Sequence, residues 1–155
     1  MRQAFALRAA RELQLLHGDR MDVVFHGLSM DPLLFEGDRV VVEAVDVGDI
    51  VVGDVICYRH DDKYPARRVV ARGADHFVLW CDAWPQLQFR ADFESVLGRV
   101  VARTRNGHEL AATSPEWLGR RDRALVAYRR ARIGIEARRV ARGLHRRLPP
   151  WGRSR

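Results

Sequence analysis

Short runs of β-branched and aromatic residues, each closed by a polar turn, constrain the fold of this chain more than any other feature. Such side chains favour strands because they pack well on a pleated surface. The regular spacing of the runs predicts a mainly β body, a bent antiparallel sheet with a barrel-like form. The expected strands cover residues 21–25, 39–45, 54–59, 67–71 and 76–80, with a last pair around 97–101.

The N-terminal residues differ from this body. Their apolar side chains recur at helical spacing, which predicts an amphipathic helix within residues 1–20, packed on a β domain at 21–112. A membrane-surface anchor is the alternative, although helices that pack on a core are commoner than interfacial ones. The apolar residues are Phe5, Ala9, Leu13 and Leu16.

The C-terminal segment, residues 113–155, is predicted to be a basic helix. Ser114 and Pro115 are a typical N-cap and first helical residue. Residues 120–155 hold thirteen arginines against two acidic residues, a net of +11, which leaves −4 for the preceding residues out of the total of +7. Two apolar stripes run along this helix: Leu118, Leu125, Tyr128 and Ile135 form one, and Val126, Ile133, Val140 and Leu144 form the other.

The charge of this tail predicts an anionic partner, because a dense positive field attracts lipid headgroups, nucleic acid or acidic protein. Leu, Ile, Val and Tyr interleaved with arginine fit an interfacial helix, so an anionic membrane surface is favoured. The tail has few aromatic residues for base stacking, which argues against nucleic acid. A solvated helix docked on the body by one apolar stripe is an alternative that is compatible with either partner.

Ser29 is the candidate functional residue, in the segment 26–38 that follows the first predicted strand. Gly27 permits a backbone that a bulkier residue would block, and a serine held at a strand end is how a nucleophile is presented to a cleft. We expect Gly27, Met30, Pro32 and Leu33 to form the binding surface around it. The simpler interpretation is a turn, since Ser, Asp, Pro and Gly are common in turns.

A longer pattern strengthens the functional interpretation. Residues 27–38 read Gly-x-Ser-Met-x-Pro-Leu-Leu-x-x-Gly-Asp and precede an apolar strand. Gly-Asp-Val-Ile at 53–56, Arg-Arg-Val-Val at 67–70, Cys-Asp-Ala at 81–83 and Leu-Gly-Arg-Val-Val at 97–101 follow. In this order, they resemble the boxes of the signal peptidase I family, which shares its fold with the self-cleaving LexA-like repressors. The resemblance covers about residues 20–105 and implies that β fold.

The resemblance implies that Ser29 attacks a peptide carbonyl and that its own amide helps to hold the oxyanion. The position of the family's general base is occupied by Arg67, and a guanidinium cannot act as a neutral proton acceptor near neutral pH. Asp82 corresponds to an aspartate that orients the base in histidine-type relatives. Its simpler interpretation is a turn cap.

Other bases are conceivable in the neighbouring sequence. Lys63 and His60 lie in the turn before Arg67, and His26 lies three residues before Ser29. A lone lysine or histidine in a polar turn is more often solvated than catalytic. Arg67 therefore occupies the base position without being able to act as a base, and Lys63, His60, His26 or a different register of the motif stay open as alternatives.

The sequence predicts a serine endopeptidase-like protein that cleaves a peptide or protein segment bound in extended form. The competing hypothesis is a peptide-binding module of the same fold, catalytically impaired by Arg67. Charged residues interrupt the apolar N-terminal pattern, so we expect a cytoplasmic protein, with a peripheral position at the inner membrane face as the alternative. Cys57 and Cys81 are expected to be buried free thiols, and no metal or cofactor is expected.

Overall fold

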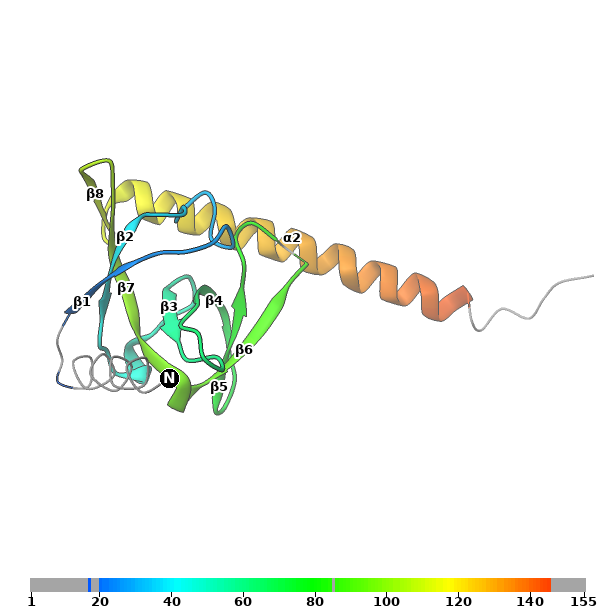
Figure 1. Cartoon of the computed structure of the whole chain (residues 1–155). Coiled ribbons are helices and arrows are strands. Elements are labelled where there is room, and N and C mark those ends of the chain that lie inside the picture. Colours follow the sequence, from blue (N-terminus) through cyan, green and yellow to red (C-terminus); the bar gives the residue numbers. More distant parts are fainter. Residues whose placement is uncertain (1–16, 18–19, 85, 146–155) are drawn as a thin grey trace, which may run out of the picture.

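The computed structural model describes residues 17, 20–84 and 86–145 (Figure 1). The predicted mainly β body and C-terminal helix are confirmed, whereas the N-terminal helix expected within residues 1–20 falls outside the described part except for its last positions. The elements are β1 (Arg20–Val24), β2 (Arg39–Glu43), η1 (Val47–Asp49), β3 (Val55–Tyr58), β4 (Ala66–Arg72), β5 (His76–Trp80), β6 (Gln88–Asp92), η2 (Phe93–Ser95), β7 (Val96–Arg105), β8 (His108–Ala111) and α2 (Pro115–His145).

The described strands form one eight-stranded antiparallel sheet in the order β1-β2-β7-β3-β4-β5-β6, with β8 also paired to β7. The long strand β7 is its centre: residues 99–104 pair with β2, and residues 96–99 pair with β3. Register shifts in both pairings bend the sheet at this junction. Gly98 lies there because a Cβ at this position would overlap the carbonyl oxygen of Glu43.

The serine segment is anchored to the sheet by its own apolar side chains. Met30, Leu33 and Leu34 are completely or almost completely buried and pack with residues of β2 and β7 such as Val42 and Val100. Met30 and Leu33 are therefore core residues. Their burial attaches the loop firmly to the body. A second cluster, formed between β3, β4 and β5, contains Ile56, Val69, Phe77 and Leu79.

The hairpin of β7 and β8 extends the sheet beyond the strands expected from the sequence. Its turn contains Asn106 and Gly107, both with positive φ, at 50° and 78°. This is the backbone that a two-residue hairpin turn requires, and Asn-Gly is its strongest sequence signal. The short strand β8 brings the chain to the start of α2.

The helix α2 begins at Pro115, as predicted, and Ser114 caps it by accepting a hydrogen bond from the Trp117 amide at 3.2 Å. Its first half packs on the body through Trp117 and Tyr128, which are both buried. Tyr128 makes an edge-on ring contact with Trp80 of β5. Beyond Tyr128 the helix extends away from the sheet (Figure 1), and the side chains of residues 132–138 are all exposed.

Candidate functional site

The backbone holds Ser29 in the loop that connects β1 to β2. The Phe25 amide donates to the carbonyl oxygen of Asp38 at 2.8 Å, which closes the loop at its base. Gly27 has a φ of +108°, a conformation that favours glycine and lets the chain turn before the serine. Ser29 is only 6% exposed, and its carbonyl oxygen accepts a hydrogen bond from the Ala83 amide at 3.2 Å.

The structure brings Arg67 of β4 directly to the serine hydroxyl. Arg67 Nη1 donates to Ser29 Oγ at 2.6 Å and to the carbonyl oxygen of its neighbour Ala66 at 2.7 Å. The guanidinium also lies over the ring of Phe89 on β6, 5.1 Å from its centroid. Arg67 thus stands where a base would have to stand, but as a hydrogen-bond donor.

This geometry determines the chemistry of the hydroxyl. A guanidinium has donors only and stays charged at any ordinary pH, so it cannot take the proton of Ser29. The serine oxygen accepts from Arg67, and its own proton remains available to a different acceptor. The pair is therefore suited to hydrogen bonding with a ligand rather than to generating an alkoxide.

Ser29 and Arg67 line a cavity of about 540 Å³ between β1 and the turn that precedes β4. Gly27 lines it too, as predicted for a binding residue, whereas Met30, Pro32 and Leu33 do not. Most of its surface is apolar, which suits the side chain of a peptide or another apolar group. The apolar wall includes Met21, Val23, Phe25, Val40, Val42 and Val100.

The alternative bases are placed differently from Arg67. Lys63 lines the same cavity, whereas His60 packs near the Tyr58 ring, with 6.2 Å between the ring centroids, and does not line it. His26 lies at the rim, where its Nδ1 is 2.8 Å from Glu36 Oε1. Among the described residues, no hydrogen bond joins these side chains to Ser29.

Asp82 is paired with Arg68, whereas the resemblance implies that it orients the general base. Its carboxylate receives two hydrogen bonds from Arg68, one of them from Nε at 2.8 Å, and Arg68 Nη1 donates to the Gly53 carbonyl oxygen at 2.8 Å. The side chains of Arg68 and Asp82 are 0% and 4% exposed. Asp82 therefore neutralises a buried cation next to the site, and both of its oxygens are occupied in doing so.

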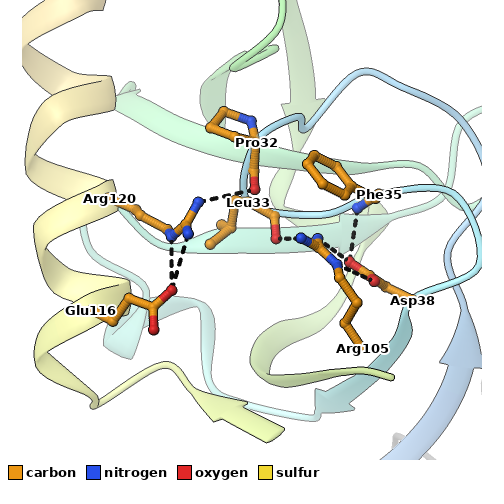
Figure 2. A network of polar contacts seen from close by, with 7 residues as sticks. All are labelled: Pro32, Leu33, Phe35, Asp38, Arg105, Glu116 and Arg120. Carbon is orange, nitrogen blue, oxygen red and sulfur yellow. Dashed lines mark hydrogen bonds and ion pairs between the residues drawn. The ribbon is translucent and has the colours of Figure 1, made fainter. Parts of the chain in front are cut away.

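A polar network that the sequence analysis did not identify holds the serine loop from the side of the helix (Figure 2). Arg105 of β7 donates to both carboxylate oxygens of Asp38, at 2.8 and 2.7 Å, and to the Leu33 carbonyl oxygen at 3.3 Å. Its guanidinium also lies 3.7 Å from the centre of the Phe35 ring. Burial alone would raise the pKa of Asp38, but the hydrogen bonds from Arg105 and from the Phe35 amide lower it below its ordinary value.

Helix α2 takes part in the same network. Arg120 donates to the Pro32 carbonyl oxygen at 3.2 Å and pairs with Glu116 one turn earlier at 3.0 Å (Figure 2). The loop that carries Ser29 is thus fixed by β7 on one side and by the start of α2 on another. The sequence signal for these contacts was weak, because arginines are frequent throughout the chain.

The two cysteines are free and buried. Burial raises the pKa of the Cys57 thiol to about 12 and also raises the pKa of Cys81. Neither side chain is therefore suited to act as a nucleophile, although Cys57 lines the cavity.

Comparison with known proteins assigns no family to this chain, so its functional interpretation depends on the geometry of the site. No family model and no curated protein sequence matches this chain. Within the described residues, no helix has the length and apolar character needed to cross a membrane.

Proposed function

We propose that this chain is a peptide-binding protein with a barrel-like fold of the signal peptidase and LexA type, in which Ser29 and Arg67 bind rather than cleave. The observation that carries the proposal is the 2.6 Å hydrogen bond from Arg67 Nη1 to Ser29 Oγ. A catalytic serine needs a neighbouring group that accepts its proton, and the group in that place is a permanent donor. The serine proton is left to donate to a carbonyl oxygen of the ligand.

The walls of the cavity support an extended peptide as the ligand. Strand β1 is an edge strand of the described sheet, and its residues Met21, Val23 and Val24 line one wall. Residues 62–67 line the same cavity. An edge strand offers unpaired backbone groups to an added strand, while the cavity beside it receives alternate side chains. An apolar side chain next to the bound carbonyl fits this arrangement best.

The cytoplasm is the location that we propose for this binding. Cys57 and Cys81 are both unpaired and lie in the core. Free buried thiols are typical of proteins that fold in a reducing compartment.

Binding and cleavage can be measured together by passing unmodified random-sequence peptides over the immobilised protein and identifying what is retained by mass spectrometry. We expect retention of intact peptides enriched in apolar residues. Val23→Lys, which puts a charge into the cavity wall, should abolish retention. Asp22→Lys, on the exposed face of the same strand, is the matched control and should preserve it. Equal retention by the two variants, with both folded, would refute a ligand site in this cavity.

A serine endopeptidase is the second candidate, supported by the presence of Lys63 on the same cavity as Ser29. A lysine amine, unlike a guanidinium, can take the proton of a serine hydroxyl when it is neutral. In the experiment above, this function would produce peptides with new termini, and the products would disappear in Ser29→Ala and in Lys63→Met. Retained peptides with their original ends would support the binding module instead.

A further inference from the structure

Helix α2 presents, on its side turned away from the sheet, a strongly basic surface that the body does not use. Within residues 120–138 there are seven arginines against Asp122 and Glu136. Arg123, Arg129 and Arg130 make no ion pair with any described residue. The residues before 120 carry a net negative charge, so the positive charge is concentrated on this helix rather than spread over the molecule.

The two apolar stripes of α2 differ in how far they are exposed to solvent. The stripe that contains Leu125 and Tyr128 faces the body, where Tyr128 is buried and Leu125 is partly buried. The stripe of Val126 and Ile133 faces away, and these side chains are 44% and 68% exposed. We call this second stripe, together with Arg123, Arg129 and Arg130, the outer face of α2.

The outer face combines apolar and basic residues in the pattern of an interfacial helix. At 100° per residue, Val126 and Ile133 share one line along the helix, and the three arginines flank this line on both sides. Residues 129–145 alone span about 25 Å beyond the docked half. The sequence places Val140 and Leu144 at the next positions of the same line. Such a surface can bury its apolar line at the acyl boundary while its arginines reach lipid phosphates.

We propose that the outer face of α2 binds an anionic lipid bilayer. Charge complementarity favours an anionic partner, because the three arginines on this face make no ion pair with any described residue, and the nearby Asp122 is paired with Arg121. The exposed Ile133 and Val126 favour lipid over nucleic acid, since a phosphate backbone gives apolar side chains nothing to contact. Residues 129–145 also contain no Phe, Tyr or Trp on which a base could stack. This surface lies away from the cavity and is independent of the ligand bound there.

Liposome flotation of the full-length chain at low salt tests the proposal. We expect the protein to float with vesicles of phosphatidylcholine and phosphatidylserine, and to lose this binding with phosphatidylcholine alone or at high salt. Replacing Arg123, Arg129 and Arg130 with glutamine should lower the partition coefficient by about a hundredfold. Ile133→Asp should also weaken binding, and because Ile133 is exposed this variant should stay folded by circular dichroism.

The control removes the same charge from the body, by glutamine at Arg20, Arg39 and Arg90, which are exposed residues of the sheet. This variant should float like the wild type. The proposal is overturned if the full-length chain does not float with anionic vesicles, or if the two triple variants lose binding equally. It is also overturned if duplex DNA at equal phosphate concentration displaces the protein from the vesicles.

Discussion

Arg68 and Asp82 form the most buried ion pair next to the candidate site, and its loss is predicted to be costly. Asp82→Asn leaves the guanidinium of Arg68 without a counter-charge in a place that water does not reach. We expect the free energy of unfolding to fall by about 3–5 kcal/mol in a urea titration. Asp92→Asn, in an exposed pair with Arg90, should lower it by less than about 1 kcal/mol. Equal effects of the two substitutions would contradict this role of Asp82.

The lowered pKa of Asp38 predicts that the stability of the fold depends on pH. Because its folded pKa lies below the ordinary value of 3.8, the ionised carboxylate stabilises the fold above that pH. This contribution is lost as the pH falls below 3.8 toward the folded pKa. Asp38→Asn should therefore be less stable than the wild type at neutral pH, and the difference should shrink on acidification. Denaturation curves at several pH values measure this, and a constant difference would rule it out.

The sequence predicts the position of the two central residues better than it predicts their partners. Ser29 and Arg67 come from an ordered set of motifs, and the structure joins them by a hydrogen bond. Asp82 could not be assigned in this way, because its partner depends on how β4 carries Arg68 toward the loop after β5. A carboxylate in a turn looks the same in the sequence whether it orients a base or neutralises a buried arginine.

For the helices and strands, the sequence predicts those features that depend on local contacts. Ser114 and Pro115 mark the start of α2, and a hydrogen bond to the backbone is enough to explain them. The docked face of α2 is a tertiary property, because apolar residues occur on both sides of the helix. The buried rings of Trp117 and Tyr128 decide which stripe packs on the sheet.

Alanine substitutions on both faces of α2 test which face packs on the sheet. Trp117→Ala removes a buried ring from the main core and should lower the free energy of unfolding by about 3–5 kcal/mol. Ile133→Ala, on the exposed stripe, should change it by less than about 0.5 kcal/mol. Thermal or chemical denaturation of both variants provides the comparison. A large loss with Ile133→Ala would mean that the outer face is packed and not exposed.

In the whole molecule, the bent sheet forms a cavity beside an edge strand, and the helix reinforces the loop that carries Ser29. Arg105 and Arg120 hold this loop from β7 and from α2, so the serine is supported firmly, although no described side chain that could act as a base is hydrogen-bonded to it. The outer face of α2 is turned away from these contacts. The proposed ligand binding in the cavity and the proposed lipid binding by the helix can therefore be tested separately by mutation.

Reactivity of Ser29 toward a fluorophosphonate probe tests most directly whether this site binds or cleaves. The native protein is incubated with the probe and digested, and the peptide that contains Ser29 is examined by mass spectrometry. We expect no labelling of the wild type, because Arg67 cannot accept the serine proton. Arg67→Lys should gain labelling at Ser29, because an amine, unlike a guanidinium, can accept the serine proton when it is neutral. Labelling of folded wild-type protein at Ser29, absent in Ser29→Ala, would contradict a non-cleaving site.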